Sequence, residues 1–294
     1  MIDVNKLAQQ YFDDEVEQMI FIKTCKTILQ LYETKDNLAI SLSGGKDSTV
    51  LMHLCKLLNI DIPIVFCDTG LEFPEIKEFA YMYATQIVKP STNFFKITKE
   101  YGIPAISKEQ SRYVADVQSE TVSHKTKAKR LIRNGKFSIS LKYRWIIDSK
   151  FKLSEKCCYH LKKAPLKKLG YYYMTGERVQ ESKLRKQSYH QCILPKKAVP
   201  LRLWTEKMIN QFIDRGGFDI CSIYNDSRIT RTGCMLCLYG CQYDDKWNLI
   251  KEKYPKHYKV AELHGLIELK DLLTGQQCKC CKRPVSLCNC EVTL

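Results

Sequence analysis

A hexapeptide of small and charged residues, Ser43-Gly44-Gly45-Lys46-Asp47-Ser48, has the composition that most directly suggests chemistry. It follows the apolar run 38–42 and precedes a helix-like run that ends near residue 58. Glycines let backbone N–H groups approach phosphate oxygens, and a helix start adds positive partial charge. The two serine hydroxyls can donate hydrogen bonds, the lysine brings a full charge, and the aspartate can hold Mg²⁺. We therefore predict a phosphate-binding loop rather than an incidental tight turn.

The elements that must position this loop alternate between strands and helices. We predict strands over 38–42, 62–67, 94–97 and 171–174, and helices over 4–33, 48–58, 74–88, 205–215, 247–254 and 258–273. Such alternation is typical of an α/β fold with a doubly wound parallel sheet, which binds ligands at the carboxyl ends of its strands. Asp68 and Thr175 each follow an apolar strand and are expected at that same edge.

The hexapeptide resembles the pyrophosphatase loop of the adenine-nucleotide α-hydrolase (HUP-type) superfamily. Four further segments resemble the phosphoadenylyl-sulfate (PAPS) reductase branch in its iron–sulfur form. They are Asp68-Thr69-Gly70 with Phe73-Pro74-Glu75, Thr175-Gly176-Glu177-Arg178 with Glu181, Ser182 and Arg185, Pro200-Leu201 with Trp204-Thr205, and the cysteine pairs Cys157-Cys158 and Cys234/Cys237.

The resemblance implies an adenine nucleotide, either ATP with Mg²⁺ or an adenylyl sulfate, and names its binding residues. These are Ser41, Ser43, Gly44, Gly45, Lys46, Asp47, Ser48, Asp68, Thr69, Gly70, Thr175, Gly176, Arg178 and Arg185, with Lys46, Asp47 and Arg178 as catalytic residues. Two alternatives stay open. Arg178 can pair with Glu181 instead of a ligand, and Asp68 can cap the helix that begins near Pro74.

The net charge of +15 is concentrated in one part of the sequence. Residues 105–168 carry 17 Lys/Arg against 5 Asp/Glu, whereas residues 1–104 carry 10 against 14. We interpret 105–156 as a basic insertion. Its interleaved aromatic residues suit phosphate pairing and base stacking, so tRNA or DNA is one expected partner; a solvated basic face is the alternative. The aromatic residues are Tyr113, Phe137, Tyr143, Trp145 and Phe151.

Fifteen cysteines in a chain without a signal-like N-terminus or a long apolar run indicate a cytoplasmic protein with metal or redox sites. The resemblance implies that Cys157, Cys158, Cys234 and Cys237 hold a [4Fe–4S] cluster. Zinc bound by the same thiols is the alternative. A second group, Cys278, Cys281, Cys288 and Cys290, has spacing that suits a small Zn²⁺ site.

Reductases of this branch carry a catalytic cysteine in a C-terminal Glu-Cys-Gly-x-His segment, and this sequence has none. We therefore keep two hypotheses. The first is an ATP pyrophosphatase that adenylates an acceptor for sulfur transfer, with a nucleic acid as one candidate acceptor and a sulfur or electron donor protein as partner. The second is a sulfonucleotide reductase that acts on adenylyl sulfate or PAPS with a thioredoxin- or glutathione-type donor. The expected organisation is a nucleotide-binding domain over 1–218 and a cysteine-rich region over 219–294.

Overall fold

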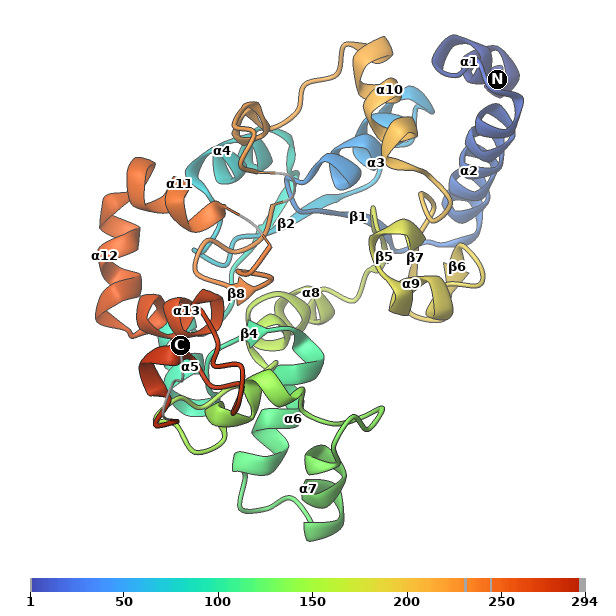
Figure 1. The fold of residues 1–294 in the computed structure, drawn as a ribbon. Helices are drawn as coiled ribbons and strands as arrows, with labels where there is room; N and C mark the ends of the chain where they lie inside the picture. Colours follow the sequence, from blue (N-terminus) through green and yellow to red (C-terminus); the bar gives the residue numbers. More distant parts are fainter. Residues whose placement is uncertain (1, 230–231, 244, 291–294) are drawn as a thin grey trace. The chain divides into compact units, whose positions relative to one another are not determined.

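The computed structural model describes residues 2–229, 232–243 and 245–290 (Figure 1). The chain divides into two compact units. Unit 1 comprises Met1–Asp68, Glu72–Lys89 and Pro165–Thr232, and unit 2 comprises Thr69–Leu71, Pro90–Ala164 and Gly233–Leu294. Both units are therefore assembled from segments that are distant in the sequence. The division at residue 218 stays a prediction.

Unit 1 is built on a six-stranded sheet in the order β3-β2-β1-β5-β7-β6. All neighbouring strands are parallel except β6 and β7. The strands are β1 (Leu38–Leu42), β2 (Ile64–Cys67), β3 (Gln86–Val88), β5 (Tyr172–Met174), β6 (Ile193–Leu194) and β7 (Lys197–Ala198). The sequence order runs outward from β1 through β2 to β3 and resumes on its other side at β5, so β1 lies at the switch point where α/β sheets bind ligands. The predicted α/β fold class is confirmed.

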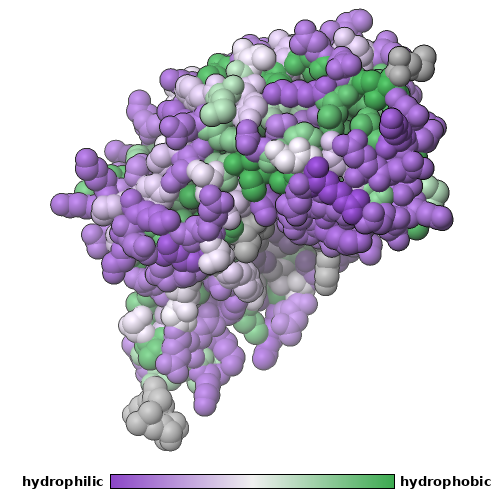
Figure 2. All heavy atoms as spheres, turned by 90° about the horizontal axis from the view of Figure 1, so that it is seen from above, coloured by the Kyte–Doolittle hydropathy of each residue, from purple (hydrophilic) through white to green (hydrophobic). Residues whose placement is uncertain are grey.

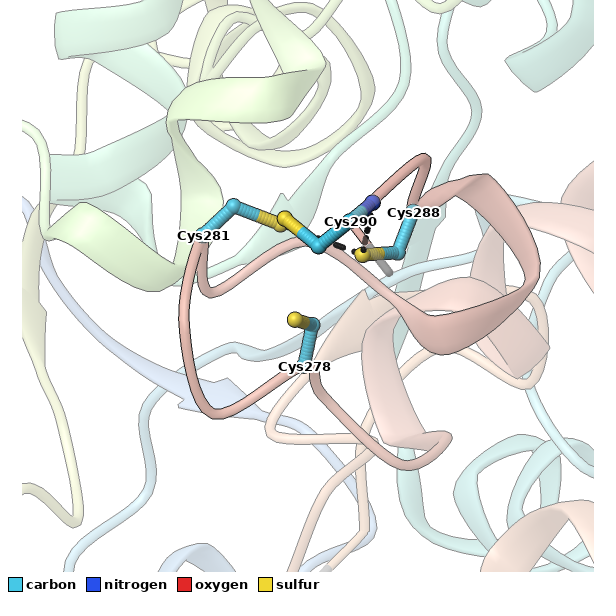
Figure 3. A group of neighbouring side chains, drawn as sticks. All are labelled: Cys278, Cys281, Cys288 and Cys290. Carbon is cyan, nitrogen blue, oxygen red and sulfur yellow. Dashed lines mark hydrogen bonds between the residues drawn. The ribbon is translucent and has the colours of Figure 1, made fainter. Parts of the chain in front are cut away.

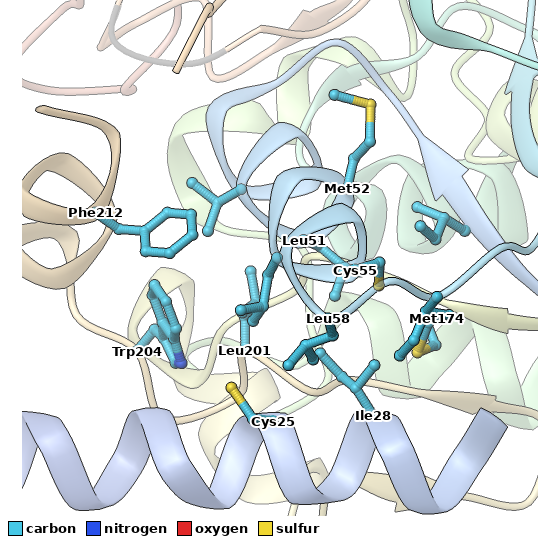
Figure 4. Close-up of a cluster of buried hydrophobic side chains, with 14 of the residues drawn as sticks. Cys25, Ile28, Leu51, Met52, Cys55, Leu58, Met174, Leu201, Trp204 and Phe212 are labelled. Carbon is cyan, nitrogen blue, oxygen red and sulfur yellow. The ribbon is translucent and has the colours of Figure 1, made fainter. Parts of the chain in front are cut away.

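The helices of unit 1 pack around a core shared with this sheet. They are α1 (Val4–Tyr11), α2 (Glu15–Thr34), α3 (Lys46–Leu57), α4 (Pro74–Tyr83), α9 (Lys183–Ser188) and α10 (Glu206–Gly216). Cys25 and Ile28 of α2 face Leu51 and Cys55 of α3 across this core (Figure 4). The indole N–H of Trp204 donates to Thr24 Oγ1 at 3.0 Å, so the one polar atom of this buried ring has a partner.

One predicted strand of the nucleotide-binding half was wrong. Residues 94–97 begin helix α5 (Phe94–Tyr101), because Asn93 caps it by accepting the backbone N–H of Lys96 at 3.0 Å. Phe94 and Ile97 are the buried residues of this helix, a spacing that fits helical as well as extended structure. The third strand is instead β3, within the range that we predicted as the end of a helix.

Unit 2 joins the basic insertion to the chain's C-terminal part. The parallel pair β4 (Ala105–Ile106) and β8 (Leu238–Tyr239) connects them. The helices are α5, α6 (Lys108–Gln118), α7 (His124–Leu131), α11 (Lys246–Lys253), α12 (Pro255–Leu263) and α13 (Leu266–Thr274), with 3-10 turns η1 (Leu141–Ile146) and η5 (Val285–Leu287). The helix predicted over 258–273 is divided by Gly265, whose φ of +70° is left-handed. Among the described residues no helix is both long and apolar enough to cross a membrane.

Candidate functional site

The predicted phosphate loop leads from β1 into the N-terminus of α3. Gly45 is the N-cap residue and offers no side chain to the first turn of the helix. The loop is held by its serines, because Ser48 Oγ accepts the Ser43 backbone N–H at 3.1 Å and lies 2.9 Å from Ser43 Oγ. Gly44 has a φ of +71°, and a Cβ there would lie 2.8 Å from Ile76 Cγ2. The segment therefore needs its glycine, and its N-cap residue has no side chain that would cover the helix start.

A second loop, which follows β5, packs directly on this one. A Cβ on Gly176 would lie 2.6 Å from the carbonyl carbon of Asp47 and 2.7 Å from the backbone nitrogen of Ser48. Only glycine permits such an approach of two backbones. Thr175 continues the strand pairing by donating its N–H to the Ala198 carbonyl at 3.0 Å. The structure thus brings together two predicted segments that are more than a hundred residues apart.

Arg178 links these loops through carboxylates. It is only 5% exposed, and its Nε lies 2.9 Å from Asp47 Oδ1 while Nη2 donates to Glu206 Oε2 at 2.5 Å. Burial alone would lower the pKa of Arg178, but Asp47 and Glu206 outweigh it and the pKa is raised. Glu181 accepts the backbone N–H of Arg178 at 2.8 Å, so it binds the main chain of this residue. The guanidinium therefore stays charged beside the phosphate loop.

The surroundings of Asp47 shift the pKa of its carboxyl group. Burial raises its pKa to about 6 despite the opposing charge of Arg178, and the nearby Glu181 and Glu206 add to the rise. Desolvation and like charges both disfavour the ionised carboxylate. A cation bound beside Asp47 would remove this penalty, and a carboxylate oxygen is a ligand that Mg²⁺ prefers. The donor chemistry of the loop therefore fits a magnesium–phosphate group.

Sequence reasoning missed two residues of this site, Tyr224 and Thr232. The Lys46 backbone N–H donates to the Tyr224 hydroxyl at 3.3 Å, and that hydroxyl lies 3.1 Å from Thr232 Oγ1. The Lys46 ammonium lies 5.1 Å from the centre of the Tyr224 ring. No sequence motif predicts these two residues, because they lie in a loop-rich segment and contact α3 only in the folded chain.

The remaining residues that we predicted to bind the nucleotide differ in their positions and in their contacts. Ser41 lies within β1 opposite Val65 of β2. Asp68 is buried at the end of β2, where it accepts a hydrogen bond from Tyr81 at 2.7 Å and pairs with Lys77 at 3.1 Å. Arg185 pairs with Glu181 and with Glu177, the latter at 3.6 Å. Thr69 and Gly70 belong to unit 2.

Unit 2 contains the four cysteines expected to bind a cluster. Burial raises the pKa of Cys157, and Cys158, Cys234 and Cys237 lie close enough to raise it further. Burial likewise raises the pKa of Cys237 to about 12. The chain continues from Cys158 into a π-helical turn, η2 (Tyr159–Lys163), a widened geometry that is frequent at functional sites. The two pairs therefore lie near one another, with Cys157 buried and the other three partly exposed.

Two features beside these thiols were not predicted. Lys246 is 7% exposed, and its ammonium donates to the Cys237 carbonyl at 2.7 Å. A buried cation needs anionic partners, which metal-bound thiolates would supply. A cavity of about 570 Å³ lies beside Cys158. Its lining is basic and aromatic: Tyr101, Lys108, Glu155, Lys156, Cys158, Tyr159, His160 and Lys163.

The aromatic residues of the basic insertion do not form a stacking surface. Tyr113, Tyr143, Trp145 and Phe151 are each less than a tenth exposed, and only Phe137 among the five reaches 39%. The prediction that they stack on bases is wrong for the four buried rings, because they build the interior of unit 2. Arg130 is also committed locally, since it pairs with Asp116 at 2.8 Å and lies 4.0 Å from the Tyr113 ring. Hydrophilic side chains nevertheless cover most of the face shown in Figure 2.

The tail cysteines form a compact group (Figure 3). The sulfurs of Cys278, Cys281, Cys288 and Cys290 all lie within 4.8 Å of one another. Hydrogen bonds from the Cys281 backbone, the Cys288 side chain and the Cys280 backbone lower the pKa of Cys278 to about 6.

These features define an α/β protein with polar loops gathered at the switch point of a mostly parallel sheet. Residues 37–239 match the phosphoadenosine phosphosulfate reductase domain, and the chain belongs to that family.

Two curated relatives match only part of this chain. An uncharacterized protein of Methanocaldococcus jannaschii is 43% identical over 77 residues, which are 24% of this chain and 16% of that protein. Phosphoadenosine 5'-phosphosulfate reductase of Vibrio cholerae serotype O1 is 33% identical over 81 residues, which are 27% of this chain and 32% of that protein. The chain thus spans at most about a third of the length of either relative.

A solved structure is also similar, the phosphate complex of PAPS reductase from Candida auris. It has a TM-score of 0.40 and 15% identity, with 79% of this chain and 93% of that chain covered. A likeness this distant adds nothing to the family assignment.

Proposed function

We propose that this chain is a nucleotide enzyme that binds ATP at Ser43–Ser48 and acts at the α-phosphate. The observation that carries the proposal is the start of α3, whose N-cap glycine has no side chain, with two serine hydroxyls and the Gly176 backbone packed against it. Backbone N–H groups at such a helix start, together with Lys46, form a site for phosphate oxygens. Its place at the switch point of the sheet adds independent support.

The proposed reaction transfers the adenylyl group. An acceptor oxygen forms a bond to the α-phosphorus, the bond from that phosphorus to the bridging oxygen breaks, and pyrophosphate leaves with the bonding electrons. The acceptor's proton passes to solvent. Lys46 and Arg178 would stabilise the negative charge that develops on the phosphate oxygens, and Asp47 would orient the metal. Bound Mg²⁺ would neutralise charge on the phosphates.

We further propose that Cys157, Cys158, Cys234 and Cys237 hold an iron–sulfur cluster. Support comes from the proximity of the two pairs, from the charge of Lys246 beside Cys237, and from the family membership. A cluster there would supply redox or sulfur-transfer chemistry. The cavity beside Cys158, with its three lysines, would admit an anionic group to this region.

The acceptor that we favour is a nucleic acid held by the insertion through phosphate contacts alone. Lys125, Lys129 and Arg133 in and beside α7 are exposed, whereas four of the five aromatic rings are buried and not available for stacking. The second candidate function is sulfonucleotide reduction, which the family domain favours directly. Because the sequence lacks the Glu-Cys-Gly-x-His segment, this reaction would need an attacking thiol from another part of the chain.

The test compares two reactions of the full chain purified without oxygen. Pyrophosphate release is measured with Mg²⁺–ATP and tRNA or DNA plus a sulfide donor, and sulfite release is measured with adenylyl sulfate or PAPS plus thioredoxin. We expect ATP-dependent pyrophosphate release that Lys46→Ala abolishes and that Lys56→Ala, an exposed lysine of the same helix, leaves intact. Sulfite release without pyrophosphate release would replace the proposal by the reductase function.

A further inference from the structure

The tail after α13 places four thiols around one small space (Figure 3). The sulfurs of Cys278, Cys281, Cys288 and Cys290 are mutually within 4.8 Å, and those of Cys281 and Cys288 are 3.4 Å apart. Four sulfurs at about 2.3 Å from a tetrahedral Zn²⁺ lie about 3.8 Å from one another. The spacing of the group therefore matches the coordination sphere of a single ion.

The backbone of the first pair has the form of a metal-binding turn. Cys278 donates its N–H to the Arg283 carbonyl at 2.8 Å and accepts at its own carbonyl from the Lys282 N–H at 3.1 Å. Lys282 has a left-handed φ of +60°, which reverses the chain directly after Cys281. These backbone hydrogen bonds hold the first pair of cysteines in one tight turn.

The second pair is brought back by a short return. Val285 donates its N–H to the Gln276 carbonyl at 2.9 Å, and Gln277 bridges Pro284. The 3-10 turn η5 then leads to Cys288, whose sulfur accepts the Cys290 N–H at 3.2 Å. The two pairs thus come from the two arms of one hairpin-like segment.

Little apolar burial holds this segment together. Of residues 276–290, only Cys278 and Pro284 are buried, and Val285 and Leu287 are 45% and 41% exposed. A segment of this size without a core needs a covalent or metal staple to keep one conformation. The charged side chains of Lys279, Lys282 and Arg283 add nothing to its packing.

We propose that Cys278, Cys281, Cys288 and Cys290 bind one structural Zn²⁺ that folds residues 276–290. The site lies beyond residues 37–239, which match the family domain, and it does not depend on the proposed function. Four protein ligands close the coordination sphere, as in structural rather than catalytic zinc sites. Binding replaces four thiol protons, which pass to solvent, and involves no oxidation.

The zinc site has a consequence for the two candidate functions. Cys288 and Cys290 are the tail thiols that a reductase mechanism would otherwise draw on. Held on zinc, both are committed ligands. Cys280 then is the exposed tail thiol that lies outside the group.

The experiment measures zinc and iron per chain in the full-length protein after expression with zinc and purification without oxygen. We expect about one zinc per chain, a loss of at least about tenfold in Cys281→Ser and in Cys288→Ser, and no loss in Cys280→Ser. Cys280 is the matched control because it is exposed in the same turn and lies outside the group. Unchanged zinc in the first two variants, or iron in place of zinc, would overturn the proposal.

A second measurement needs no variant and covers the case in which the serine variants misfold. Thiol alkylation followed by peptide mass spectrometry is run on the purified chain with and without a zinc chelator. We expect Cys280 to react at once in both samples, and the four ligands to react only after chelation. Equal reaction of all five tail thiols without chelator, or a Cys281–Cys288 disulfide, contradicts the zinc site.

Discussion

The phosphate loop of unit 1 and the cluster cysteines of unit 2 represent two ways of building a site. The loop is a contiguous hexapeptide whose backbone forms the binding surface, and local hydrogen bonds between Ser43 and Ser48 already shape it. The cysteines come from two segments, 157–158 and 234–237, and only the fold of unit 2 brings them together. A site of the first kind keeps its local shape when remote residues change, except where another loop packs on it, as at Gly176. A site of the second kind fails with its unit.

The largest expected effect tests the second region. In Cys237→Ser we expect iron per chain to fall to near zero, because the loss of one of four thiolates opens the cluster and leaves Lys246 with fewer anionic partners. Iron and sulfide analysis checks this, with Cys192→Ser of unit 1 as the control. ATP affinity measured by calorimetry should survive in the variant. If Cys237→Ser lost both its iron and its ATP affinity, the two sites would not be independent.

The next effect tests the first region. Gly176→Ala would place a methyl group 2.6–2.7 Å from the backbone of Asp47 and Ser48, so the two loops must separate. We expect kcat/KM for ATP-dependent turnover to fall about 100-fold, the loss typical of a misplacement near 1 Å. The iron content should not change. A variant with wild-type turnover would show that the contact of the two loops does not matter.

A pH profile sharpens the same comparison. Because burial raises the pKa of Asp47 to about 6, we expect Mg²⁺–ATP affinity to weaken as the pH falls through about 6. The folded chain holds this proton more tightly than the unfolded chain, so ionising Asp47 costs stability as the pH rises from the unfolded pKa to about 6. Asp47→Asn should remove both steps from the profiles of calorimetry and thermal unfolding. Steps that persist in the variant belong to another group.

The smallest effect concerns the basic insertion. Reversing Lys125, Lys129 and Arg133 should weaken nucleic acid binding and lower its log–log salt slope by about one unit per lost phosphate contact. Reversal of Lys6 and Lys26, exposed lysines of unit 1, is the control. Arg130 is left unchanged because its pairing with Asp116 stabilises the unit. Salt-dependent titrations with tRNA and duplex DNA that show no difference between the two sets would exclude the insertion as the binding surface.

The sequence predicts those parts of the fold that depend on interactions between neighbouring residues in the chain. The apolar run before Ser43, the glycines and the helix-forming run after Ser48 fix the strand, turn and helix order without help from the rest of the chain. Tyr224, Thr232 and Glu206 could not be predicted, because their contacts with α3 and Arg178 arise from tertiary packing. The strand predicted over Phe94–Ile97 was wrong for a different reason. A short apolar pattern fits the periods of both a helix and a strand, and the Asn93 cap favours the helix.

The pairing of β4 with β8 also sets an order of events during synthesis. Ala105 reaches its partner Leu238 only after the intervening chain, including the Pro165–Thr232 segment of unit 1, has left the ribosome. At about 5–20 residues per second this delay lasts roughly 7–27 s. The first cysteine pair, Cys157-Cys158, waits about 4–15 s at the same rate before Cys234 has been added to the chain. Unit 2 therefore receives its last segment after unit 1 has all of its own. With the proposed metal sites, a cell short of metal would accumulate chains in which unit 1 has folded and unit 2 has not.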